Sequence, residues 1–218
     1  MYNCQYYFPE AKKYLQIKVK LVLLIWFFSN KMHENKTLFH ATTICCVRKN
    51  GETAIAGDGQ VTFGQSVVMK GNAKKLRTLH NGTIVAGFAG SATDGLCLID
   101  KLESSLEKHS GQMMKSCMDL ARQWRSDKFL RQLDAMMIVA DKENMLLVSG
   151  SGDVIEPEHN ALAIGSGGQF AYCAALALLQ VESNLTAGEI AKKALEIAGT
   201  VCVYTNHNIS LEIVSNGV

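Results

Sequence analysis

The hydrophobic pattern from residue 42 onward alternates between strand-like and helix-like segments. Short β-branched and apolar runs bounded by turn residues, of which Asn50-Gly51 is the clearest turn, predict strands. These strands cover residues 42–48, 53–56, 67–69, 76–79, 83–88, 135–140, 145–149, 161–164 and 209–213. Apolar residues three and four positions apart predict helices after Ser91, from Met113, over 169–181 and after Thr186.

Two strand-rich blocks and two helix pairs therefore alternate along the chain. An element that is apolar on one face must bury that face, so this order predicts an α+β fold with two packed sheets and helices outside. We expect the first strand to lie between the two sheets, with its N-terminal end at a cleft. No linker or repeat interrupts residues 42–218, which predicts a single domain.

The first 41 residues do not share this pattern, and we interpret them as a leader or propeptide. Four lysines precede the apolar run 21–28, an arrangement that loosely imitates a secretory signal, but eight residues cannot span a bilayer. Met32 offers a different start of translation, which would leave 32–41 as a short leader and 1–31 as a wrongly assigned start. We favour the start at Met32 over a secretory signal.

Composition narrows the class of protein. The chain is 48% hydrophobic and 19% charged with a net charge of +2, which suits a globular protein and argues against a nucleic-acid partner. No membrane partner is expected. The seven cysteines are dispersed and form no C-x-x-C pair, which favours reduced thiols in the cytoplasm. Neither a zinc-binding spacing nor a G-x-S-x-G serine elbow is present in the sequence.

Thr42, which opens the first predicted strand, is the candidate nucleophile. Cleavage after Ala41 would give this residue a hydroxyl and a free α-amine. The amine has a reference pKa of about 7.7–8.0, so a useful fraction is neutral near pH 7 and can accept the hydroxyl proton. The alternative is that Thr42 and Thr43 are ordinary strand residues.

Six short motifs occur together and in one order from Thr42 to about Ile213. They are TTI at 42–44, GDGQ at 57–60, MKGNAKK at 69–75, GFAG at 87–90, IGSGG at 164–168 and YTNH at 204–207. With them the chain resembles the HslV peptidases, bacterial relatives of the proteasome β subunit among the N-terminal nucleophile hydrolases. The resemblance implies a four-layer αββα sandwich, threonine-type endopeptidase activity and a double hexameric ring. It also implies an ATP-driven AAA+ unfoldase partner, HslU, that delivers unfolded proteins.

The resemblance also implies a role for individual residues. Thr42 matches the nucleophile, and Lys75 matches a lysine that stabilises negative charge on the threonine oxygen. The chain is one residue longer than many family members between Gly64 and Met69, so Lys74 remains an alternative to Lys75. The remaining catalytic matches are the carboxylate Asp58, which pairs with the lysine, the oxyanion-hole position Gly87, and Ser166 near the threonine amine.

A monovalent cation, usually sodium, is implied at the end of the last helix. The matching positions are Gly199, Cys202 and Thr205, which would bind the ion through backbone carbonyls. ATP is used by the unfoldase and is not bound by this chain. Two other functions stay open: a non-catalytic ring or scaffold subunit that never exposes Thr42, and a small-amide N-terminal nucleophile hydrolase that works alone.

Overall fold

A computed structural model describes residues 39–40, 42–64, 66–130, 133 and 135–214. Its strands are β1 (Phe39–His40), β2 (Thr43–Lys49), β3 (Glu52–Gly57), β4 (Val61–Phe63), β5 (Val67–Lys70), β6 (Leu76–Leu79), β7 (Ile84–Gly90), β8 (Ala135–Ala140), β9 (Met145–Ser149), β10 (Val154–Ile155), β11 (Ala161–Gly165) and β12 (Ser210–Ile213). Its helices are η1 (His80–Gly82), α2 (Ala92–Lys108), α3 (Met113–Ser126), α4 (Gly168–Gln180) and α5 (Ala187–Val201).

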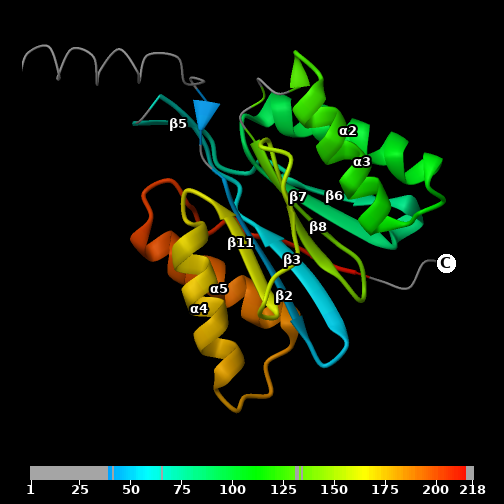
Figure 1. The fold of residues 1–218 in the computed structure, drawn as a ribbon. Helices are drawn as coiled ribbons and strands as arrows, with labels where there is room; N and C mark the ends of the chain where they lie inside the picture. Colours follow the sequence, from blue (N-terminus) through cyan, green and yellow to red (C-terminus); the bar gives the residue numbers. More distant parts are fainter. Residues whose placement is uncertain (1–38, 41, 65, 131–132, 134, 215–218) are drawn as a thin grey trace, which may run out of the picture. The chain divides into compact units, whose positions relative to one another are not determined.

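Two antiparallel sheets form the centre of the fold, with a helix pair on the outer side of each (Figure 1). One sheet has the strand order β11-β2-β3-β12, and α4 and α5 cover it. The other has the order β10-β9-β8-β7-β6, and α2 and α3 cover it. The predicted α+β arrangement, sheet on sheet with helices outside, is confirmed.

The position of the first strand differs from the expectation. We expected this strand between the two sheets, but β2 lies within one of them, paired with β3 on one edge and β11 on the other. Because the backbone N–H and C=O groups of a buried strand need partners, a ladder on both edges satisfies β2 better than a position between layers. Its side chains still contribute to both neighbouring cores, with Ile44 on one face and Cys45 on the other.

Three separate apolar cores hold the layers together. The core between the two sheets includes Ile44, Ile55 and Ile138, all fully buried. The core under α2 and α3 contains Leu98, Leu102 and Leu106, which recur every four residues along the helix predicted after Ser91, together with Trp124. The core under α4 and α5 is rich in alanine, so these two helices approach their sheet closely.

The helix starts follow the local capping chemistry. Ser91 caps α2 by accepting a hydrogen bond from the backbone N–H of Asp94. Thr186 and Glu189 form a capping box at the start of α5, each side chain accepting from the other residue's backbone N–H. None of the described helices is long and apolar enough to cross a membrane.

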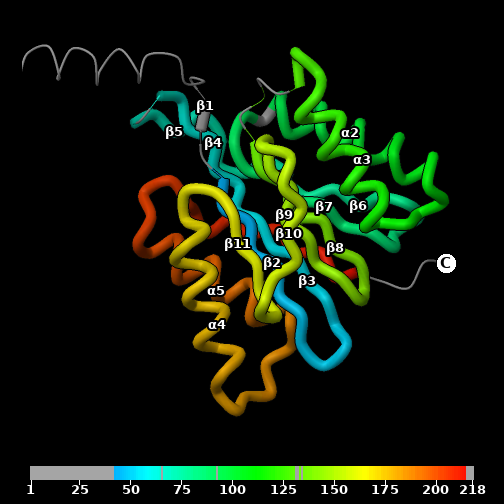
Figure 2. The backbone as a smooth tube through the Cα atoms, in the orientation of Figure 1, coloured from blue at the N-terminus to red at the C-terminus, as the bar shows by residue number. Residues whose placement is uncertain are grey.

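A third, small sheet was not predicted. It has the order β1-β4-β5, in which β1 pairs antiparallel with β4 through Phe39↔Phe63 and His40↔Thr62 (Figure 2). Strands of two or three residues, such as β1 and β4, are too short to show an alternating pattern. Residues 39–40 therefore lie along the edge of β4.

Candidate active site at the start of β2

Asp58 is the centre of the polar cluster at the start of β2. It follows β3 directly and is 0% exposed. Its Oδ1 accepts from the Thr43 backbone N–H at 2.8 Å and from Lys75 Nζ at 2.9 Å. Its Oδ2 accepts from the backbone N–H groups of Gln60 at 3.1 Å and Asn206 at 3.2 Å. A buried carboxylate needs such donors, and here three of the four come from rigid backbone.

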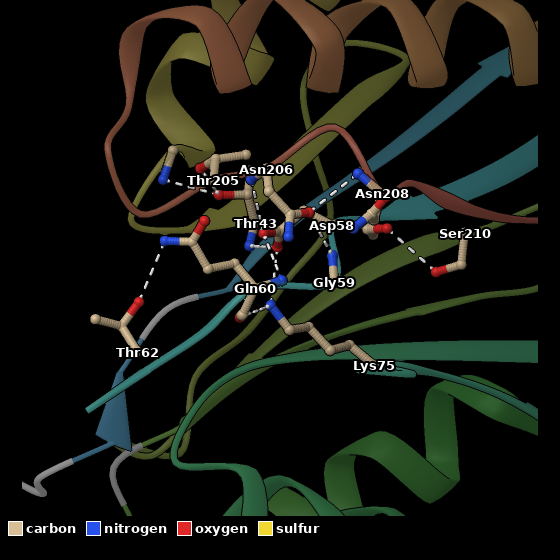
Figure 3. Close-up of polar contacts among 12 residues, drawn as sticks. Thr43, Asp58, Gly59, Gln60, Thr62, Lys75, Thr205, Asn206, Asn208 and Ser210 are labelled. Carbon is tan, nitrogen blue, oxygen red and sulfur yellow. Dashed lines mark hydrogen bonds and ion pairs between the residues drawn. The ribbon is translucent and has the colours of Figure 1, made fainter. Parts of the chain in front are cut away.

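Lys75 supplies the charge that pairs with Asp58. It immediately precedes β6, is 3% exposed, and donates to Asp58 Oδ1 and to the Gln60 carbonyl at 2.6 Å (Figure 3). Burial lowers the pKa of Lys75, while the charge and hydrogen bond of Asp58 act in the opposite direction. The carboxylate therefore helps to keep a positive charge in a place from which water is excluded.

The geometry distinguishes the two candidate lysines. Lys75 is the lysine that forms the buried ion pair with Asp58, whereas Lys74 is exposed. Of the two alternatives left by the sequence, the structure brings Lys75 to the cluster.

Thr42 immediately precedes Thr43, whose N–H binds Asp58, and is 4% exposed. Its carbonyl accepts from the Ser166 backbone N–H at 3.0 Å. Gly165 has a φ of +91°, and an added Cβ there would lie 1.7 Å from the Thr42 carbonyl oxygen. Only glycine allows this close approach, so the turn after β11 fixes the backbone of Thr42. The Ser166 residue itself is exposed.

Gly87 lies in β7 opposite Leu76, the residue after Lys75. An added Cβ at Gly87 would lie 2.9 Å from Ile44 Cγ2 and 2.9 Å from Leu76 Cδ2. The glycine thus lets the second sheet approach Ile44, two residues beyond Thr42. Close packing against Ile44 and Leu76 therefore explains why position 87 is a glycine. A role of the Gly87 N–H in the reaction remains a prediction.

The cysteines in β2 are not rival nucleophiles. Cys45 and Cys46 lie three and four positions beyond Thr42 and are both 0% exposed. Burial raises the pKa of Cys45 to about 12 and raises the pKa of Cys46 well above its usual value. Because the thiolate is the reactive form, these thiols are inert near neutral pH.

The predicted cation site lies at the end of α5. The Cys202 N–H still donates to the Ala198 carbonyl at 2.8 Å, and the Cys202 carbonyl accepts from the Thr205 N–H at 3.1 Å. A carbonyl oxygen has two lone pairs, so that of Cys202 can also bind an ion, and hard oxygen donors suit sodium. The donor type of Gly199, Cys202 and Thr205 therefore fits. Among the described residues, no group of His, Cys, Asp and Glu is suited to hold a metal.

Sequence reasoning missed several residues that build the site. Thr43 is 0% exposed, and its hydroxyl lies 2.7 Å from that of Thr205 and accepts from the Gly167 N–H at 3.0 Å. Asn206 contacts both the Asp58 turn and the segment that leads to Lys75. The motif YTNH at 204–207 marked this loop in the sequence. The hydrogen-bond partners of its polar residues depend on the folded structure and could not be predicted from the motif.

Comparisons with known proteins agree with this fold and with these motifs. A profile of the family described as "Proteasome subunit" matches residues 38–214. The chain is 56% identical over 174 residues to the "ATP-dependent protease subunit HslV" of Caldicellulosiruptor saccharolyticus, with 80% of this chain and 98% of the relative covered. It is 54% identical over 181 residues to the protein of the same description from Rickettsia felis, with 83% and 98% covered.

Solved structures agree as well. The crystal structure of eukaryotic HslV from Trypanosoma brucei superposes with a TM-score of 0.76 at 40% sequence identity, covering 80% of this chain and 99% of that one. The family match spans far more than half of the sequence, and the relatives are matched over nearly their whole length. The chain therefore belongs to the proteasome subunit family, and within it to the HslV protease subunits.

Proposed function

We propose that the chain is a threonine-type endopeptidase subunit whose nucleophile is the hydroxyl of Thr42. The observation that carries this proposal is the buried Lys75–Asp58 pair, which is bonded to the backbone nitrogen of Thr43, one residue beyond Thr42. The nearby ammonium favours the neutral form of the Thr42 amine and stabilises negative charge that develops on its oxygen. Relatives that are 54–57% identical are described as subunits of an ATP-dependent protease.

In the proposed reaction, Thr42 supplies both the hydroxyl that attacks and the α-amine that accepts its proton. In the intact chain, the Thr42 nitrogen is a peptide nitrogen, so a basic amine exists only after cleavage at Ala41. The freed amine accepts the hydroxyl proton, directly or through a water, and the oxygen attacks the substrate carbonyl. The scissile C–N bond then breaks, the protonated amine gives its proton to the departing peptide nitrogen, and water hydrolyses the acyl-enzyme that remains. The Gly87 N–H would stabilise the tetrahedral intermediate, and Ser166 would orient the proton near the amine.

The pairing of residues 39–40 with β4 indicates how an extended substrate could bind. The backbone just before Thr42 pairs antiparallel with β4 through residues 39 and 40. Removal of residues 1–41 would free this edge of β4 beside the nucleophile. An extended polypeptide can then add to the edge as a strand, with main-chain hydrogen bonds that do not depend on its sequence. Unfolded proteins fit such a site.

The assembly is inferred from the HslV relatives. We expect a double hexameric ring that encloses the active sites, with the AAA+ unfoldase HslU delivering unfolded proteins at the expense of ATP. The sodium at Gly199, Cys202 and Thr205 would support the loop after α5 and takes no part in the chemistry described above. We place the complex in the cytoplasm, because all six described cysteines are free, in agreement with a reducing compartment.

Two measurements on the purified particle test the proposal. Thr42→Ala should abolish hydrolysis of a fluorogenic peptide, whereas Thr42→Ser, which keeps a hydroxyl, should retain measurable activity with the ring assembled. Hydrolysis by Thr42→Ala would refute the assignment. Intact-mass measurement should show an active chain that starts at Thr42, while a persistent leader in an inert particle would indicate the scaffold function.

The partner and the processing step have their own readouts. HslU and ATP should stimulate degradation of casein. A rate of peptide hydrolysis that is the same with and without the unfoldase would indicate a hydrolase that works alone. Self-cleavage at Ala41 requires Thr42, so Thr42→Ala should retain its leader. Loss of the leader from that variant would instead indicate an outside protease.

A further inference from the structure

The loop after α5 reaches both segments that carry the Lys75–Asp58 pair. The Asp58 turn comes between β3 and β4, and the Lys75 segment comes between β5 and β6, so they are separate loops of the chain. Two direct features join them: Ala73 N–H donates to the Gly59 carbonyl at 2.9 Å, and a Cβ at Gly59 would lie 2.5 Å from the Gly71 carbonyl oxygen. The two loops therefore touch without a side chain between them.

Asn206 connects these loops with the two ends of its side-chain amide (Figure 3). Its Oδ1 accepts from the Gly59 N–H at 3.1 Å, next to Asp58 in the chain. Its Nδ2 donates to the Gly71 carbonyl at 2.8 Å, four residues before Lys75. Its own backbone N–H donates to Asp58 Oδ2 at 3.2 Å. Asn206 thus contacts the Asp58 turn, the Lys75 segment and the Asp58 carboxylate.

The partners of Asn206 fix which end of the amide is which. A backbone N–H can only donate and a backbone carbonyl can only accept, so a reversed amide would oppose like groups at Gly59 and at Gly71. The Asn208 N–H also donates to Asn206 Oδ1 at 3.1 Å, which confirms the acceptor end. Among the standard side chains, only an amide of this length offers a donor and an acceptor in this arrangement.

We propose that Asn206 is a positioning residue that holds the Asp58 turn and the Lys75 segment at the spacing the reaction needs. It touches no reacting atom and acts through the 2.9 Å contact between Lys75 Nζ and Asp58 Oδ1. Loss of the bridge lets the Lys75 segment shift relative to Thr42, and a misplacement of about 1 Å can lower a rate by about a hundredfold. This inference rests on the function proposed for Thr42.

Asn208 provides a matched control in the same loop. Its Nδ2 also donates to the Gly71 carbonyl, at 2.7 Å, but its side chain makes no bond to Gly59. Asn208→Ala therefore removes one of the two amide donors at Gly71 and leaves the bridge intact. Asn206→Ala removes the bridge and leaves the other donor. The pair of variants separates the bridge from the simple satisfaction of one carbonyl.

The test is steady-state hydrolysis of a fluorogenic peptide by the full assembled particle. Asn206→Ala should lower kcat by about 10–100-fold with KM changed by less than about threefold, because the substrate edge of β4 is untouched. Asn208→Ala should lower kcat by less than about threefold. A wild-type kcat for Asn206→Ala, or equal losses in the two variants, would overturn the proposal.

A second variant guards against a folding defect. If Asn206→Ala fails to assemble, Asn206→Asp keeps the acceptor for Gly59, but it places a charged acceptor oxygen where the donor to the Gly71 carbonyl was. Its kcat should still fall at least tenfold with a normal KM, and an unchanged kcat would again overturn the proposal. Thr42→Ala separates the two levels of inference, since an active Thr42→Ala defeats the proposed function, whereas an inactive one with a normal Asn206→Ala defeats only the bridge.

Discussion

Replacing Asp58 with asparagine tests how the buried ion pair supports this fold. The substitution keeps the shape of the side chain but removes the charge from a residue that is 0% exposed. Lys75 Nζ would then keep its hydrogen bond to the Gln60 carbonyl, at 2.6 Å. It would lose the charged partner to which it now donates at 2.9 Å. Removing one partner of a buried pair generally costs about 3–5 kcal/mol, because the other charge stays buried.

The part of this cost that comes from the unpaired charge has an upper bound, since Lys75 can lose its proton instead. Relative to an unfolded lysine with a pKa of about 10.4, neutralising Lys75 at pH 7.5 costs about 4 kcal/mol. We therefore expect a loss of about 3–4 kcal/mol in unfolding free energy. For a domain of this size, that loss lowers the melting midpoint by about 6–16 °C.

The loss should also depend on pH in a defined direction. Burial lowers the pKa of Lys75 already in the wild type, and loss of Asp58 lowers it further. Between the folded and unfolded pKa values the unfolded chain binds more protons, so the stability of the variant rises as pH rises toward about 10.4. With a neutral Lys75, up to about 2.7 kcal/mol is regained between pH 7.5 and pH 9.5.

The assay is thermal unfolding of Asp58→Asn at both pH values beside the double variant Asp58→Asn with Lys75→Met. The double variant carries no buried charge at this place and should recover more than half of the lost stability, although neither variant should hydrolyse peptides normally. A melting midpoint for Asp58→Asn within about 2 °C of the wild type at pH 7.5 would contradict the reasoning. So would a double variant no more stable than the single one.

Three glycine substitutions, of which Gly51→Ala is the control, test the packing around Thr42 and between the two sheets. Gly165→Ala combines a φ of +91° with a Cβ 1.7 Å from the Thr42 carbonyl oxygen, so it should lose nearly all peptide hydrolysis and about 2–4 kcal/mol of stability. Gly51→Ala has a similar φ of +78° and open space, so it should lose only about 1 kcal/mol and stay active; equal effects would exclude the clash. Gly87→Ala keeps its N–H but places a Cβ 2.9 Å from Ile44 Cγ2, and should cost about 1–3 kcal/mol in denaturant unfolding. An unchanged unfolding midpoint for Gly87→Ala would contradict the close approach of the two sheets.

Much of the fold could be predicted from the sequence because its signals are local. The turn at Asn50-Gly51, the leucine spacing in α2 and the Thr186 capping box each depend on residues within a few positions of one another. The strands and helices predicted from these local signals match those of the structure closely. The short strands β1, β4 and β10 escaped prediction because two or three residues carry no period.

The order of motifs also named candidate residues for the site, but not their contacts. Thr42, Asp58 and Ser166 could be named from the pattern, and the structure places them around the start of β2. The roles of Asn206 and Thr43 depend on partners more than a hundred residues away in the chain, namely Gly59 for the first and Thr205 for the second. No local pattern encodes such a pairing.

The sequence by itself determined the family and the layered α+β class, and it predicted Thr42 as the residue that serves as both attacker and base. Only the tertiary structure decided that Lys75, and not Lys74, pairs with Asp58, and that Asn206 joins the two loops carrying them. The physical reason is that burial and hydrogen bonding depend on which side of the backbone a side chain takes in the folded chain. The difference between neighbouring lysines is one of environment, which the packed sheets create.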